Sequence, residues 1–170
     1  HYPLRRQRQM CIRDRPYAKI KREKSMPLPY TAETLMSYLE NVFPQIRGEF
    51  AIEALQEGHI EVRLKVQERH LRPGGTVSGP AMFALADVSV YMSVLAAIGP
   101  KELAVTTNAS LDFMRKPDAG RDLIAHCKVL KLGRLLAVCD VLIYSEGKAD
   151  PVARASMTYA LPPDKTIKTQ

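Results

Sequence analysis

The stretch that decides the fold is SGPAMFALADVSVYMSVLAAIGP, residues 78–100, the longest apolar segment of the chain. Ser78 can cap a helix and Gly99 followed by Pro100 can stop one, so the stretch predicts a helix over residues 78–98. Its apolar residues fall on every side of that helix, which is typical of a helix buried at the centre of a domain. Asp87 is the one acidic or basic residue within it.

The segments around this helix show the alternation of strands. A short amphipathic helix comes first, capped by Thr31 and stopped by Pro44. Six strands are then predicted at residues 49–57, 59–67, 104–114, 122–132, 134–145 and 151–161. The fold class is therefore α+β, a curved antiparallel sheet of about six strands wrapped around the long central helix. Such a sheet cannot cover a helix that is apolar all round, so a partner subunit is expected to supply the rest.

The strand predicted at residues 104–114 lies directly after the central helix. Its alternation places one set of residues on a single face: Val105, Thr107, Ala109, Leu111 and Phe113. We expect that face to lie against the helix, with Thr107 close to Asp87.

The excess positive charge of the chain is confined to its first residues. The formal net charge is +7, and residues 1–25, with nine Lys or Arg and two acidic residues, account for all of it. We interpret residues 1–25 as a basic disordered tail, 26–163 as one domain and 164–170 as a loose C-terminal tail. Residues 10–14, MCIRD, also resemble the translated end of a sequencing adapter, which would make the first tail an artefact. Nucleic-acid binding would depend on this tail alone and is not expected.

Other features argue against a membrane span, a disulfide framework or a metal. No apolar run approaches the roughly 20 residues that a membrane span needs. The three cysteines are too scattered for a disulfide framework, and Cys127 and Cys139 are interpreted as small core residues. The histidines His59, His70 and His126 lack a metal-binding spacing, so no metal is expected. A reducing cytoplasm is the expected compartment.

Two features of the central helix could carry chemistry. Asp87 has no basic residue three or four positions away, so it either acts as a general base in a pocket or is hydrogen-bonded to a neighbouring loop. Gly79 lets a substrate approach the helix start, where its N–H could stabilise an oxyanion; the alternative is an ordinary capped helix. Eight residues separate them, about 12 Å along a helix, which is too far to serve one carbonyl within one chain. They could cooperate if two such helices packed antiparallel in a dimer.

The series from residue 72 onward resembles the phenylacetate-pathway type of acyl-CoA thioesterase in the hot-dog superfamily. RPGGTVSGP at residues 72–80, followed by LAD at 85–87, is similar to its signature. Further matches are TT at 106–107, FMRKP at 113–117, GR at 133–134 and TY at 158–159. The resemblance implies a hot-dog fold, self-association as a dimer or dimer of dimers, and hydrolysis of a small or medium acyl-CoA, aromatic ones included. No cofactor is implied beyond the coenzyme A of the substrate.

The resemblance also implies roles for particular residues. Asp87 matches the base or nucleophile, and Gly79 matches the glycine whose N–H, from the partner chain, polarises the thioester carbonyl. The implied substrate-binding residues are Arg72, Ser78, Tyr91, Thr107, Arg115, Lys116 and Arg134. Arg72 stands where the family usually has Asn or Gln, and Ser78 stands where it usually has His. These departures leave an alternative open, a non-catalytic hot-dog module that binds acyl-CoA or a related small molecule.

Overall fold

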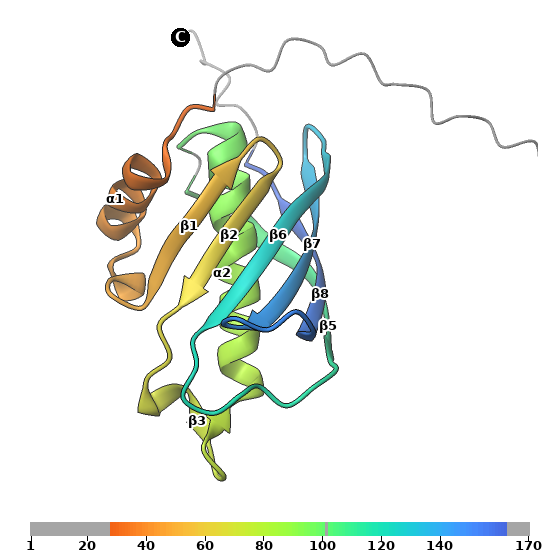
Figure 1. Ribbon diagram of the computed structural model, residues 1–170. Helices are drawn as coiled ribbons and strands as arrows, with labels where there is room; N and C mark the ends of the chain where they lie inside the picture. Colours follow the sequence, from red (N-terminus) through yellow and green to blue (C-terminus); the bar gives the residue numbers. More distant parts are fainter. Residues whose placement is uncertain (1–27, 101, 163–170) are drawn as a thin grey trace, which may run out of the picture.

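The computed structural model describes residues 28–100 and 102–162, and its centre is the helix α2, Gly79–Ile98 (Figure 1). Ser78 has extended backbone, and its Oγ accepts a hydrogen bond from the N–H of Ala81 at 3.4 Å. The helix ends where Gly99 adopts a φ of +81°, a conformation that favours glycine. Most of α2 is buried, as predicted. The two predicted tails lie outside the described residues.

A six-stranded antiparallel sheet wraps around α2 (Figure 1). Its strands are β1 (Phe50–Gln56), β2 (His59–Leu64), β5 (Val105–Phe113), β6 (Leu123–Leu132), β7 (Leu136–Ser145) and β8 (Pro151–Ala160). They lie in the order β1-β2-β6-β7-β8-β5, so β1 and β5 form the two edges. Alternate residues such as Ile60 and Val62 of β2 point inward and form one apolar core with α2. The predicted fold class, with its curved sheet and central helix, is confirmed.

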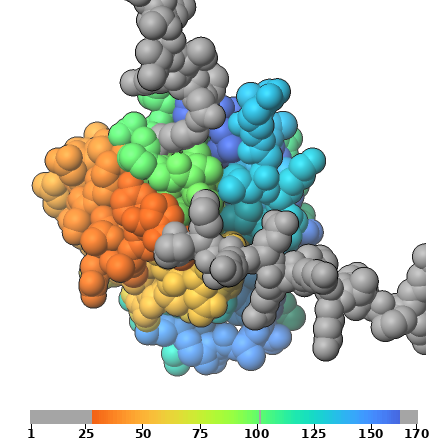
Figure 2. Space-filling model, turned by 90° about the horizontal axis from the view of Figure 1, so that it is seen from above, coloured from red at the N-terminus to blue at the C-terminus, as the bar shows by residue number. Residues whose placement is uncertain are grey.

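The remaining elements cover one edge and one end of the sheet. Helix α1 (Ala32–Val42) lies beside β1, capped by Thr31, and buries Leu35 and Leu39 one turn apart. Seen from above, α1 and the β6–β7 hairpin lie on opposite sides of the end of α2 (Figure 2). The loop predicted before α2 contains a small two-stranded sheet of β3 (Leu71–Arg72) and β4 (Thr76–Val77). Single 3₁₀ turns lie at Pro44–Ile46 and Glu68–His70.

The apolarity of α2 corrects one statement made from the sequence. An 18-residue window of this 20-residue helix has a mean hydropathy of 1.9, so by length and composition alone the helix could cross a membrane. The claim that no run approaches this length was wrong, because the few polar residues of α2 are small or isolated. In the structure 67% of that window is buried, as in the core helix of a folded domain.

A β-bulge in β5 corrects the predicted face of Thr107. The pairing with β8 passes from Thr106 opposite Tyr159 to Asn108 opposite Thr158, so Thr107 is an extra residue in the ladder. Its hydroxyl donates to the carbonyl of Thr158 at 3.1 Å and not toward α2. The alternation of side chains along the sequence does not reveal a residue inserted by a β-bulge. Thr106 therefore takes the inward position that the pattern assigned to Thr107, and the alternation resumes correctly at Ala109.

Among residues 28–100 and 102–162, one side of the fold is left without cover. Edge strand β5 is exposed on both faces over most of its length, and Val105 and Phe113 at its two ends are 56% and 55% exposed. On the neighbouring side of α2, Phe83 is 42% exposed and Ala84 is also exposed. An exposed apolar strip along a central helix and an edge strand is unusual for a monomer. An exposed apolar strip of this kind is expected where a partner covers the helix.

The two described cysteines are core residues. Cys127 of β6 and Cys139 of β7 are both fully buried free thiols, as the sequence indicated. A hydrogen bond between them, together with burial, raises the pKa of the Cys127 thiol. Both conditions keep this thiol protonated and unreactive.

Candidate active site

Asp87 lies half-buried at the middle of α2 and lines a cavity of about 380 Å³. Thr106 Oγ1 donates a hydrogen bond to Asp87 Oδ1 at 2.6 Å, and the Tyr159 hydroxyl donates to the same oxygen at 2.7 Å. The hydroxyl of Tyr159 also lies 3.0 Å from the backbone carbonyl of Asp87. Across residues 28–100 and 102–162, no hydrogen bond reaches the second carboxylate oxygen, Oδ2. One oxygen is thus fixed by the sheet, and the other is left for chemistry.

Tyr159 is well suited to hold a carboxylate. It is only 2% exposed. Burial raises the pKa of its phenol, and the hydrogen bond that it donates to Asp87 raises that pKa further. Tyr159 therefore remains a neutral donor throughout the working range of an enzyme.

Aromatic rings form much of the wall of the Asp87 cavity. Tyr91, one helical turn after Asp87, lines it as predicted, together with Phe43 and Tyr159. The ring of Tyr91 lies 6.3 Å from that of Phe43 and 6.5 Å from that of Tyr159, and its hydroxyl donates to the carbonyl of Glu102 at 3.1 Å. The cavity therefore combines a held carboxylate with flat apolar surfaces.

Gly79 lies in a different cavity, of about 420 Å³, at the start of α2. As the first residue of the helix, it has an N–H with no acceptor inside the helix. An added Cβ would lie only 3.2 Å from Cζ of Phe113, so the ring packs directly over this position. Asp87 lines the first cavity and Gly79 the second, and within one chain no described cavity contains both. The separation estimated from the sequence is present in the fold.

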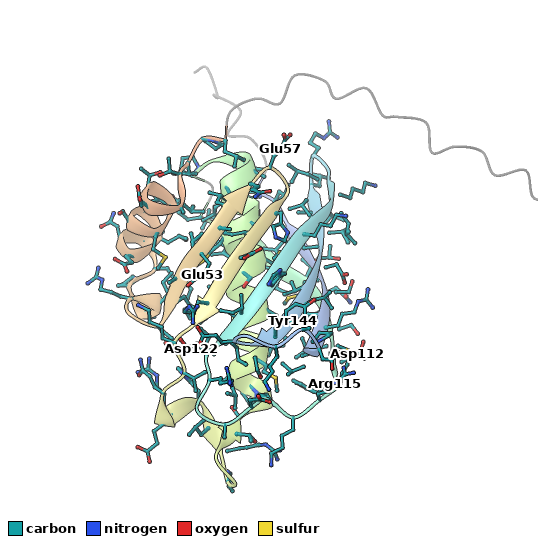
Figure 3. All side chains as sticks on the ribbon, in the orientation of Figure 1. Glu53, Glu57, Asp112, Arg115, Asp122 and Tyr144 are labelled. Carbon is teal, nitrogen blue, oxygen red and sulfur yellow. The ribbon has the colours of Figure 1, made fainter. Side chains whose placement is uncertain are left out.

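Basic side chains surround the Gly79 cavity. Arg72, Arg115 and Lys116, three of the implied substrate-binding residues, all line it. Arg72 Nε donates to Thr76 Oγ1 at 3.1 Å, and Arg115 Nη1 donates to the carbonyl of Pro151 at 3.2 Å. Figure 3 shows Arg115 just beyond the end of β5, at the end of the molecule where α2 begins. The cavity is thus a cationic site beside a helix N-terminus, where anions are favoured.

Three predicted site residues lie apart from these groups. Arg134 is exposed in the β6–β7 turn, at the end of the sheet near Tyr159 and far from Arg115. Ser78 borders Gly79 in sequence but uses its hydroxyl as the helix cap. Thr107 points away from Asp87, as described above.

Sequence reasoning missed Thr106 and Tyr159 as the partners of Asp87. A signal was available for Tyr159, because it continues the inward face of β8 formed by alanine and methionine, and a buried phenol needs an acceptor. For Thr106 no signal existed, since its inward orientation depends on the bulge. The sequence left two alternatives for Asp87, a place in a pocket or a hydrogen bond to neighbouring residues. In the structure Asp87 both lines a cavity and accepts hydrogen bonds.

A sheet wrapped around one apolar helix is the architecture of the hot-dog fold, and here a carboxylate on that helix faces a cavity. A family model described as "Thioesterase superfamily" matches residues 74–152. The chain is 30% identical over 115 residues to "Putative esterase PA0474" of Pseudomonas aeruginosa, covering 68% of this chain and 84% of that protein. The chain therefore belongs to the thioesterase superfamily, and its expected activity class, thioester hydrolase, is confirmed.

Solved structures agree with this assignment. A crystal structure named as a "putative thioesterase" from Silicibacter sp. TM1040 is 65% identical, with a TM-score of 0.77, covering 82% of this chain and 97% of that one. A mutant of the phenylacetic acid degradation protein PaaI from Thermus thermophilus is 29% identical, with a TM-score of 0.60 and coverages of 69% and 97%. A Streptococcus mutans protein bound to acetyl CoA shares the fold at 23% identity and a TM-score of 0.61, covering 69% of this chain and 92% of that one. The resemblance to the phenylacetate-pathway type is thereby confirmed.

Proposed function

We propose that this protein hydrolyses acyl-CoA thioesters at composite sites, each with Asp87 from one subunit and the Gly79 N–H from the other. The observation that carries the proposal is that Asp87 and Gly79 line separate cavities within one chain. Two α2 helices packed antiparallel across a twofold axis would bring the two cavities together in pairs. We further propose that the reaction takes place in the cytoplasm.

The roles of the residues follow from their chemistry. Asp87 Oδ2 either takes a proton from water that attacks the thioester carbon or attacks that carbon directly. The partner's Gly79 donates its N–H to the carbonyl oxygen as negative charge develops there. Collapse of the tetrahedral intermediate breaks the carbon–sulfur bond. In the first route the proton taken up by Asp87 passes to the departing sulfur of coenzyme A and the free acid is released. In the second route coenzyme A leaves and water then hydrolyses the anhydride formed with Asp87. Thr106 and Tyr159 hold the carboxylate in position during these steps.

The substrate class is supported by the different linings of the two cavities. The Asp87 cavity, of about 380 Å³ and walled by three aromatic rings, suits a small or medium acyl group, aromatic ones included. Arg72, Arg115 and Lys116 in the Gly79 cavity suit the phosphates of coenzyme A. The acetyl CoA bound to the fold relative from Streptococcus mutans is compatible with such a ligand.

Dimer formation is supported by the uncovered side of the molecule. The exposed Phe83 and Ala84 lie on the side of α2 that carries Asp87, within about one turn of it along the helix. A second copy packed on this side would cover both the helix and the exposed edge of β5. In this arrangement Arg134 would lie at the Asp87 end of the composite site to which its own chain supplies Asp87.

The first test is thiol release from short, long and aromatic acyl-CoAs by the wild type and Asp87→Asn. We expect release by the wild type and a loss of about 10²–10⁴-fold in kcat for the variant, the range for a lost general base. A fully active Asp87→Asn variant would contradict the assignment. Binding of acyl-CoA without any release would favour a ligand-binding module instead.

Two substitutions distinguish the effect of losing the Gly79 N–H from the effect of adding a Cβ at this position. Gly79→Pro removes the N–H, and the extended backbone of Ser78 is compatible with a following proline. Gly79→Ala adds the same Cβ near Phe113 but keeps the N–H, so it is the matched control. We expect Gly79→Pro to be slower than Gly79→Ala by about 10²–10³-fold, the cost of one oxyanion donor.

Mixing inactive variants tests whether the site is shared. A heterodimer of an Asp87→Asn chain with a Gly79→Pro chain would contain one intact site and one doubly defective site. Refolding an equal mixture should therefore restore about one quarter of the wild-type activity for a twofold-symmetric dimer. Absence of any recovery, with heterodimers demonstrated, would show that each chain uses its own two residues.

A further inference from the structure

The sheet carries a second cluster of chemically active side chains on the face opposite α2. On β2, Ile60 and Val62 point into the core, so His59 and Glu61 point outward. On β6, Ala125 and Cys127 are buried, so His126 points outward as well. The register pairs Glu61 directly with His126 across the two strands. Strand pairing thus assembles a group that spacing along the sequence gave no reason to expect.

The geometry of this cluster is that of a set of metal ligands. Glu61 Oε1 lies 3.4 Å from His59 Nε2 and 3.6 Å from His126 Nδ1. All three ligand atoms lie within 4.8 Å of one another. A tetrahedral ion with bonds of 2.0–2.2 Å places neighbouring ligand atoms about 3.4 Å apart, so little movement is needed.

We propose that His59, Glu61 and His126 bind one divalent ion of the zinc type. Two imidazole nitrogens and one carboxylate oxygen are ligands that suit zinc, and three protein ligands leave a fourth position for water. The three side chains are 33%, 33% and 40% exposed, so an ion can enter from solvent. The bound ion would join β2 to β6 and stabilise the sheet by mass action. This site is independent of the proposed thioesterase chemistry.

The charges around the cluster permit a cation. Arg63, two residues along β2 from Glu61, bonds to Glu53, Asp122 and Glu146, so its charge is engaged elsewhere. Figure 3 labels Glu53 and Asp122 on this side of the sheet. Lys128, the register partner of His59, is exposed and faces Asp140 on β7.

One wall of the cluster is aromatic. The ring of Tyr144, labelled in Figure 3, meets the ring of His126 edge to face at 4.9 Å between centroids. The ring of His59 lies 6.0 Å from that of His126. These contacts restrict the imidazole of His126, which lowers the entropy lost when it binds a metal.

The test uses the full chain, stripped of metal by a chelator and titrated with zinc in a calorimeter. Glu61→Gln removes the central ligand, and Glu57→Gln, in the exposed turn between β1 and β2, is the control with the same change of charge. We expect wild type and Glu57→Gln to bind one zinc ion at the cluster, and Glu61→Gln to bind it at least about 100-fold more weakly. Cobalt should give the visible absorption of a tetrahedral site in the wild type and Glu57→Gln but not in Glu61→Gln. Zinc should likewise raise the unfolding temperature of the wild type and Glu57→Gln but not that of Glu61→Gln.

Two results would overturn the proposal. One is the absence of saturable zinc binding, and the other is binding by Glu61→Gln as tight as that of the wild type. His1 and Cys11 lie outside the described residues and carry groups that bind zinc, so the comparison of variants assigns the site. If Glu61→Gln fails to fold without metal, His126→Asn provides the same comparison from β6.

Discussion

The carboxylate of Asp87 is held by two hydroxyl groups through a single oxygen. Thr106 and Tyr159 both donate to Oδ1, at 2.6 and 2.7 Å, from neighbouring strands β5 and β8. Hydrogen bonds to a charged acceptor are stronger than neutral ones, so they restrict the rotation of the carboxylate. An unpaired charge at this depth would be costly, and two donors offset that cost while one oxygen remains available. The sequence pointed to Asp87 as a candidate base, and the structure shows the two hydroxyl donors that hold its carboxylate in position.

Replacement of Tyr159 by phenylalanine tests this positioning. The ring is retained and one hydrogen bond to the carboxylate is lost, which is worth about 1.5–3 kcal/mol. If that energy acts in the transition state, kcat should fall about ten- to hundredfold while KM changes little. Steady-state thiol release from the best acyl-CoA measures both constants.

Tyr144→Phe is the matched control for this substitution. Tyr144 lies on the outer face of the sheet, where its ring contacts His126 and is remote from α2. We expect its kcat to stay within about twofold of the wild type. A Tyr159→Phe enzyme as active as this control would mean that Thr106 alone holds the carboxylate.

The bulge in β5 determines which side chains of that strand reach the helix. The partners of Thr106 and Asn108 are adjacent residues of β8, Tyr159 and Thr158, so the ladder is continuous on both sides of Thr107. Bulges of this kind occur often at sheet edges and beside active sites, where they redirect side chains. Here the bulge lets Thr106 reach Asp87 while Phe113, further along, still packs over Gly79.

Deletion of Thr107 tests whether the bulge is needed for folding. Without it, Thr106 and Asn108 would pair with consecutive residues of β8 in a regular ladder, with every later side chain on its present face. We therefore expect a folded protein whose free energy of unfolding changes by about 1 kcal/mol or less. Urea denaturation measures it. A chain that fails to fold would indicate that the bond from Thr107 to the carbonyl of Thr158 is essential.

The elements themselves could be predicted from the sequence, because each depends on local patterns. Thr31 and Ser78 cap their helices where expected, and alternation on β2 and β8 gives the correct inward faces. Thr107 was misplaced because a bulge depends on pairing with another strand. His59, Glu61 and His126 escaped notice for the same reason, since the register between β2 and β6 brings them together. Long-range pairing is the part that a single sequence does not reveal.

For the whole molecule, several tyrosines link stability to alkaline pH. Burial is the main cause that raises the pKa of Tyr91 and of Tyr159. The charge of Glu102 raises the pKa of Tyr91 further, and the hydrogen bond to Asp87 does so for Tyr159. Both groups have an ordinary value of 10.0, which applies to the unfolded chain. Their protonated forms are thus favoured in the folded state.

The protein should therefore lose stability as the pH rises above about 10, the ordinary pKa of a tyrosine. Below that value both states keep these protons, so the contribution is fully present. Above it, the unfolded chain releases protons that the folded state retains, and unfolding becomes more favourable with each step in pH. Guanidinium denaturation of the wild type and Tyr159→Phe between about pH 8 and 11 checks this linkage. The variant should lose stability less steeply at the alkaline end; parallel curves would show that the phenol of Tyr159 ionises in the folded protein as readily as in the unfolded chain.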